Sequence, residues 1–338
     1  MTQIPREALD LPAAWRGREL SGSGDWIQHF DEECVAELAA AARAAAATGK
    51  PLEALCRDDF PLPKLGAATA AWLDELDRGR GFLLLRGLPV ERWGDELSRL
   101  AYLGLGLHMG RLSSQNAAGD LLGHVRDTGA DPNDPAVRLY KTRKAQPFHT
   151  DGADVIGLLC LRTAKRGGAS HITSSISVFR AIQERRPELV PLLFEPFHFD
   201  RNEEQAPGEA PTFQLPICHF DGQRLRTFYV GWYIRDAQRH PSVPRLTQPQ
   251  KELLDMIDAL AADPELRLDM DFRPGDIQLL KNSSILHGRA EYEDWDEPAR
   301  KRHLLRIWVT AHSGFSGSVE LVQGIPAKSG VKSDSASL

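Results

Sequence analysis

After about residue 106, the chain consists of short apolar runs separated by glycine and proline, and this pattern constrains the fold most strongly. Runs of about four to eight residues suit strands better than helices when turn residues bound them. Four such runs, at 155–161, 227–233, 277–280 and 304–310, are candidate strands. Their spacing predicts an antiparallel sandwich or barrel.

The first hundred residues are typical of helices instead. Acidic residues open a predicted helix over 32–48 and glycine follows it, and further helices are expected at 66–78 and 91–103. A buried strand is expected between them at 82–86. Two later helices are predicted at 176–186 and at 248–262, the second with a capping box of Thr247 and Gln250. The fold class is therefore mixed α/β and β-rich. The segment 199–216 is expected to be a long loop that covers a site.

Composition excludes several classes of protein. The 338 residues contain 41 Lys and Arg against 47 Asp and Glu, so the net charge of −6 gives no general reason to bind nucleic acid or an anionic membrane. The first residues lack a signal-peptide pattern, and no apolar stretch approaches the length of a membrane helix. Four cysteines without a C-x-x-C pair read as reduced thiols. We therefore expect a cytoplasmic protein.

The segment Gln146–Pro147–Phe148–His149–Thr150–Asp151 carries the first candidate for chemistry. In an extended chain His149 and Asp151 leave the same face, about 7 Å apart at the backbone. One further imidazole would complete a 2-His-1-carboxylate triad, the ligand set of non-haem Fe(II) oxygenases. The H-x-D spacing alone is also compatible with a surface turn after Pro147.

His287 is the favoured third ligand among eleven histidines. A turn is predicted at Arg273–Pro274–Gly275–Asp276, directly before a candidate strand. A second short apolar run ends at His287, which is followed by a glycine. An ordinary buried histidine is the alternative.

Arginines near the end of the chain form a second candidate site. If 302–310 is one strand, Arg302 and Arg306 share a half-apolar face. A guanidinium stays charged when it is buried and can donate two parallel hydrogen bonds to a carboxylate. Arg306 is therefore expected to have an anionic partner. That partner is either a bound anion or a carboxylate of the protein.

These elements, in their order, resemble the TauD/TfdA-type dioxygenases that depend on iron(II) and 2-oxoglutarate. The resemblance rests on H-x-D at 149–151, Gly167–Gly168, Pro-Gly-Asp before His287, and Arg306 located 306 − 287 = 19 residues later. It spans about residues 80–312. It implies that His149, Asp151 and His287 bind Fe(II).

The resemblance also assigns roles around the metal. Arg306 would hold the distal carboxylate of 2-oxoglutarate, and Ser170 falls where relatives place a threonine that hydrogen bonds the same group. Arg302 falls where some members meet an anionic substrate. Gln115 and Asn116 are candidates for donating amide hydrogen bonds to the substrate, although the residues favour a polar loop over this role.

The implied fold is a double-stranded β-helix, or jelly roll, braced by N-terminal helices. One domain over 1–312 is expected, with a helical elaboration at 1–105, the core at 106–312 and a tail at 313–338. The implied reaction uses O2 to convert 2-oxoglutarate to succinate while oxidising a C–H bond of a small polar or anionic metabolite. Asp151 favours hydroxylation or desaturation over halogenation, and a homo-oligomer is plausible by resemblance.

Two other functions fit the same residues. A jelly-roll binding protein would lack turnover, because fold alone does not fix function. A zinc hydrolase also uses two histidines and a carboxylate. Formation of succinate separates the dioxygenase from both.

Overall fold

The computed structural model describes residue 4 and residues 6–9, 11–116, 119–131, 137–205, 207–311 and 315. Seven α-helices lie within these residues: α1 (Gly17–Leu20), α2 (Glu32–Ala47), α3 (Pro63–Arg78), α4 (Val90–Met109), α5 (Ser175–Arg185), α6 (Gly231–Asp236) and α7 (Gln248–Ala262). Short 3-10 helices are η1 (Arg6–Leu9), η2 (Leu52–Ala54), η3 (Arg57–Asp59), η4 (Leu139–Lys141), η5 (Pro187–Phe194), η6 (Ala237–Arg239) and η7 (Pro298–Arg300). None of the helices in these ranges is long and apolar enough to cross a membrane.

The larger of two main sheets has seven strands in the order β1-β2-β14-β6-β17-β3, with β4 also paired to β17. Its pairs are antiparallel except for β1 with β2. The strands are β1 (Ile27–His29), β2 (Phe82–Arg86), β14 (Ile277–Lys281), β6 (Val155–Arg162), β17 (His303–Ala311), β3 (Gly110–Leu112) and β4 (Gly123–Val125).

The smaller main sheet has four antiparallel strands in the order β13-β8-β15-β5. They are β13 (Arg267–Met270), β8 (Ser170–Ser174), β15 (Ile285–Arg289) and β5 (Gln146–His149). Three two-stranded ribbons complete the β-structure: β9 (Pro196–Asp200) with β10 (Thr212–Pro216), β11 (Cys218–Phe220) with β12 (Leu225–Thr227), and β7 (Arg166–Gly167) with β16 (Tyr292–Glu293).

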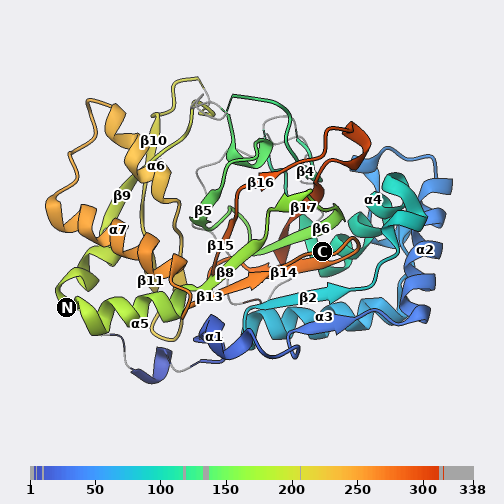
Figure 1. The fold of residues 1–338 in the computed structure, drawn as a ribbon, viewed down its shortest axis with the longest axis horizontal. Coiled ribbons are helices and arrows are strands. Elements are labelled where there is room, and N and C mark those ends of the chain that lie inside the picture. Colours follow the sequence, from blue (N-terminus) through green and yellow to red (C-terminus); the bar gives the residue numbers. More distant parts are fainter. Residues whose placement is uncertain are drawn as a thin grey trace, which may run out of the picture.

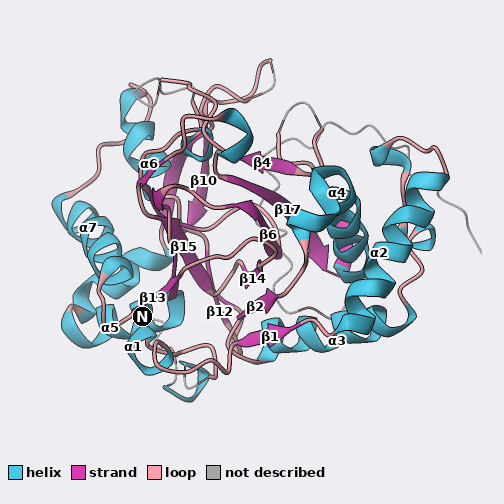
Figure 2. Cartoon of the chain, turned by 45° about the vertical axis from the view of Figure 1, so that its right-hand side comes forward, coloured by secondary structure: helices cyan, strands magenta, loops and turns pink. Residues whose placement is uncertain are grey.

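Alternation of side chains along the strands divides the core into layers. Phe82 and Leu84 of β2 join Ile156 of β6, Ile172 of β8 and Ile285 of β15 in a cluster that contains residues of both main sheets. The intervening Leu83 and Leu85 belong to a separate cluster with α2, α3 and α4. A third cluster joins the smaller sheet to α5, α6 and α7. Figures 1 and 2 show the two helical groups on opposite sides of the strands.

Most of the predicted elements are present. The helices expected at 32–48, 66–78, 176–186 and 248–262 correspond to α2, α3, α5 and α7, and Thr247 and Gln250 form the capping box. The helix expected at 91–103 continues to Met109 as α4, with non-helical dihedrals at Gly94. Strands β2, β6, β14 and β17 lie where the apolar runs predicted them.

Two expectations are wrong. The segment 199–216 is not one long loop, because Pro196–Asp200 and Thr212–Pro216 pair as an antiparallel ribbon. Only the residues between these two strands form a loop. The strand expected at 227–233 is also absent. β12 ends at Thr227, and the chain then forms the short helix α6. The apolar residues of this segment therefore lie in an irregular turn and a helix rather than on the face of a sheet.

Gly275 supports the predicted turn before β14. Its φ of +87° and the hydrogen bond from Asp276 N to Arg273 O, 3.0 Å long, suit the third position of a type II turn. A Cβ at this position would lie 1.9 Å from the carbonyl oxygen of Leu88. Glycine is therefore required here both by conformation and by space.

We predict that Gly275→Ala lowers the free energy of unfolding by about 3 kcal/mol or more, because strain at positive φ adds to steric overlap. Gly222→Ala is the matched control: φ is +96° there, but nothing lies within 4 Å of the added methyl. Its loss should be about 1 kcal/mol. Chemical denaturation measures both, and equal losses would contradict the steric argument.

Candidate metal centre

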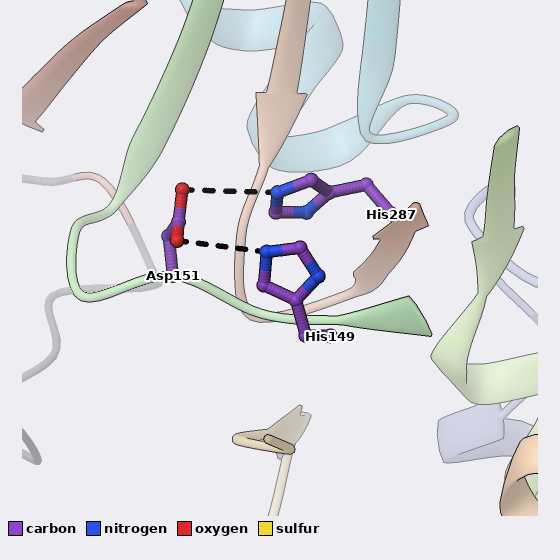
Figure 3. Close-up of side chains that lie close together, drawn as sticks. All are labelled: His149, Asp151 and His287. Carbon is purple, nitrogen blue, oxygen red and sulfur yellow. Dashed lines mark ion pairs between the residues drawn. The ribbon is translucent and has the colours of Figure 1, made fainter. Parts of the chain in front are cut away.

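The two histidines of the predicted triad lie opposite each other on neighbouring strands. His149 ends β5, His287 lies in the middle of β15, and the two are register partners. Asp151 follows β5 by two residues. One ligand atom from each residue lies within 4.8 Å of the others, and Figure 3 shows both rings turned toward the carboxylate. The structure therefore brings together a set of donors that can hold a metal ion.

Hydrogen bonding fixes the proton on His149. Its Nδ1 lies 2.9 Å from the carbonyl oxygen of Pro147, which can only accept, so Nδ1 carries the proton and Nε2 keeps its lone pair. Nε2 lies 3.7 Å from Asp151 Oδ1. Burial, then the neighbouring His287, lowers the pKa of His149 to about 3. The ring is therefore neutral at physiological pH, as a metal ligand must be.

Asp151 is held in place through both its backbone and its side chain. Its N–H donates to Asn282 Oδ1 over 2.7 Å, and Asn282 Nδ2 donates back to its carbonyl over 2.6 Å. Arg306 Nη1 and Trp308 Nε1 both donate to Oδ2 over 3.1 Å. Burial alone would raise the pKa of the carboxyl, but Arg306 and the two histidines hold it well below its usual range. The carboxylate is therefore ionised.

Arg306 in turn depends on Gln115. Arg306 Nε donates to Gln115 Oε1 over 2.7 Å, and Gln115 Nε2 donates to the Arg306 carbonyl, also over 2.7 Å, and to that of Leu121 over 3.1 Å. Both ends of this buried amide are used within the protein, which differs from the expected donation to substrate. Asn116 is half-buried, and its Nδ2 donates to Asp120 Oδ2 over 2.8 Å.

One cavity joins the two histidines of the predicted triad to three of the other predicted site residues. It is lined by His149, His287, Ser170, Arg302 and Arg306, and Gln115 and Asn116 lie outside this lining. The remaining lining residues are Val125, Tyr140, Gln146, Leu158, Phe272, Gly288, Arg289 and Leu304. The Ser170 hydroxyl lies within hydrogen-bonding distance of the Gln278 amide.

Arg302 differs from Arg306 in its partners. It is only 4% exposed, and its guanidinium lies 5.1 Å from the centre of the Tyr292 ring. Nη1 has no hydrogen-bond partner among the described residues, and burial lowers the pKa of the guanidinium. A buried cation in this state is suited to an incoming anion.

Sequence reasoning missed His303, the residue that follows Arg302 in the chain. Its Nδ1 is 3.0 Å from Arg162 Nη2, and its Nε2 is 2.8 Å from His124 Nδ1. Arginine only donates, so Nδ1 of His303 must accept and Nε2 must carry the proton. Position beside Arg302 was its one signal in the sequence.

The Trp232 side chain also lies at the metal site, with its ring centre 5.1 Å from that of His149 and the planes at 63°. It belongs to α6, the helix that replaces the predicted strand. No residue pattern in the sequence pointed to it.

Comparison with known proteins places the chain in a family. Residues 47–308 match the family model described as "Taurine catabolism dioxygenase TauD, TfdA family", so the chain belongs to this family of dioxygenases. FR-33289 synthase from Streptomyces rubellomurinus is 30% identical over 317 residues, covering 93% of this chain and 94% of that protein. The taurine hydroxylase-like protein SAT17 from Stachybotrys chartarum is 31% identical over 316 residues, covering 88% and 79%.

A solved structure is similar in fold. Asparagine oxygenase in complex with Fe(II), 2S,3S-3-hydroxyasparagine and succinate superposes with a TM-score of 0.65 at 18% identity, covering 84% of this chain and 93% of that one. The mixed α/β fold is therefore that of an Fe(II) oxygenase.

We predict that the stability of the protein falls as the pH is lowered from about 6.5 to about 4, in part through His303. Burial, then His124 and Arg162, lowers the pKa of His303 from 6.5 to about 4. Between these pH values His303 is protonated in the unfolded chain but neutral in the folded one, so lowering the pH favours unfolding. Chemical denaturation across this range should show a shallower pH dependence for His303→Gln. An unchanged dependence would contradict this role.

Proposed function

We propose that the protein is an Fe(II)- and 2-oxoglutarate-dependent dioxygenase that hydroxylates a C–H bond in a small polar or anionic metabolite. The observation that carries the proposal is that two imidazoles and an ionised carboxylate converge beside a cavity that is also lined by two arginines. Three ligands on one side of a metal leave positions for a chelating co-substrate and O2.

The donors fit Fe(II) well. His149, Asp151 and His287 would hold the metal, which when bound supplies the oxygen chemistry. The protein supplies the positions of the ligands: Pro147 orients His149, and Arg306 and Trp308 orient Asp151. Arg306 also keeps the carboxylate ionised, whereas burial and the neighbouring His287 keep the His149 imidazole neutral.

Geometry favours Arg302 over Arg306 as the anchor for the distal carboxylate of 2-oxoglutarate. Arg306 contacts Asp151, a proposed metal ligand, whereas two methylene groups separate the distal carboxylate of 2-oxoglutarate from its chelating end. Arg302 lines the same cavity and is buried, and its Nη1 has no hydrogen-bond partner among the residues that the structure describes. We therefore propose that Arg302, with Ser170, binds the distal carboxylate, and that Arg306 serves the metal end and an anionic group of the substrate.

The architecture is consistent with a double-stranded β-helix. The proposed metal-binding histidines lie on the smaller main sheet, whereas Arg306 lies on β17 of the larger, mostly antiparallel one, so the site is shared between the two sheets. We propose that residues 1–312 form one jelly-roll domain, with α2, α3 and α4 bracing its outer face through their shared core cluster. The family match across 47–308 supports a single unit. A homo-oligomer stays a prediction.

Succinate formation tests the proposed reaction. Protein supplied with Fe(II), ascorbate, O2 and a suitable metabolite should convert 2-oxoglutarate to succinate, and His149→Ala should abolish this because a ligand is lost. Chromatography measures succinate, and His219→Ala, at an exposed histidine of β11, is the matched control. Turnover that survives in His149→Ala would exclude this ligand assignment. Zinc-dependent hydrolysis, or binding without turnover, would exclude the dioxygenase.

The two arginines are separated by a second experiment. Arg302→Ala should raise the KM for 2-oxoglutarate about 100-fold, the effect of losing about 3 kcal/mol of charge-assisted hydrogen bonding. Affinity for Fe(II) should stay unchanged, because Arg302 touches no metal-binding residue. Arg306→Ala should instead weaken Fe(II) binding through Asp151. If only Arg306→Ala raises the KM and Fe(II) binding is retained, the distal carboxylate belongs to Arg306, as the sequence predicts.

A further inference from the structure

Gln146 occupies a position beside the metal-binding atoms. It is the first residue of β5, three before His149, and its side chain is one of those that line the cavity. Its Nε2 lies 3.1 Å from His149 Nε2. This is the nitrogen that a metal would take, because Nδ1 is engaged with Pro147.

The direction of this hydrogen bond follows from the tautomer. His149 Nε2 carries a lone pair and no proton, so the Gln146 amide donates and the imidazole accepts. A bound metal would use the same lone pair. Gln146 and the metal therefore compete for one acceptor, and metal binding leaves the amide N–H without its partner.

Arg289 holds the backbone next to Gln146. Arg289 is the cross-strand partner of Gln146, is 6% exposed, and donates from Nη2 to the carbonyls of Thr142, over 3.0 Å, and Lys144. The chain that leads into β5 is thus tied to β15. A polar N–H kept in a partly buried cavity costs free energy unless a new acceptor reaches it. Oxygen atoms of a ligand bound beside the metal would supply such an acceptor.

We propose that Gln146 is a positioning residue for the co-substrate. Its amide caps His149 Nε2 in the metal-free protein and donates to a metal-chelating oxygen of 2-oxoglutarate once metal and co-substrate are bound. This rests on the proposed function. If Gln146 acts in this way, its side chain lowers the affinity for Fe(II) and raises the affinity for 2-oxoglutarate.

Gln146→Met tests the proposal because it keeps the length of the side chain and removes the donor. Anaerobic titration of the Fe(II)-loaded protein with 2-oxoglutarate, followed by the visible charge-transfer absorption of the chelate, gives the Kd. We expect this Kd to rise by about 10-fold, the effect of one hydrogen bond to a charged acceptor. Fe(II) affinity without 2-oxoglutarate, measured by competition with a chelator, should be equal or higher.

Two further variants sharpen the test. Gln146→Glu replaces the donor with a carboxylate, so it should bind Fe(II) more tightly and 2-oxoglutarate still more weakly; it carries the test if the methionine variant does not fold by circular dichroism. Gln214→Met, at an exposed glutamine of β10, should match the wild type in both titrations.

The outcomes separate the two proposals. Absence of the charge-transfer absorption in the wild-type protein would overturn the proposed function itself. A normal absorption with an unchanged Kd in Gln146→Met would overturn only the role of Gln146. Loss of Fe(II) affinity together with 2-oxoglutarate affinity in that variant would also overturn it, because a purely structural role weakens both.

Discussion

The pairing of β5 with β15 is the constraint on which the metal centre depends. His149 and His287 meet because they are register partners, and a slip by one residue would turn one imidazole to the opposite face. β15 is fixed on its other edge by five consecutive partners in β8, from Ser170 to Ser174. The register that brings the histidines together is thus set by the whole smaller sheet. The positions of Ser170 and Arg289 follow from the same pairing.

Charge is arranged around this centre in successive contacts. A buried carboxylate is costly unless it is paired and hydrogen bonded, and Asp151 receives a guanidinium and an indole N–H. Arg306 in turn needs an acceptor for its Nε, which Gln115 provides. The net charge of −6 therefore coexists with a locally cationic cavity, because Arg302 and Arg306 line it. Within the described ranges, Arg302 Nη1 has no acceptor.

The sequence predicted the parts of the site that depend on local chemistry. The spacing of His149 and Asp151, the glycine turn before β14 and the alternation along β17 are local patterns, and the elements they predicted are present. His303 and Trp232 could not be found in this way, because their importance comes from contacts between distant segments. α6 was mistaken for a strand because a short apolar run has the same composition in either structure. The exchange of roles proposed for Arg302 and Arg306 likewise needed the contact of Arg306 with Asp151, which alternation along a strand does not reveal.

The division of the site between two sheets has a consequence for its chemistry. His149 and His287, the proposed metal ligands, belong to the smaller sheet, and Arg306 belongs to the larger one. The separation of metal and anion-binding groups is therefore set by the side chains packed between the sheets, among them Phe82, Ile156, Ile172 and Ile285. Close-packed cores transmit small changes in volume. Binding of 2-oxoglutarate between the proposed metal site and a guanidinium would thus depend on these packed residues as well.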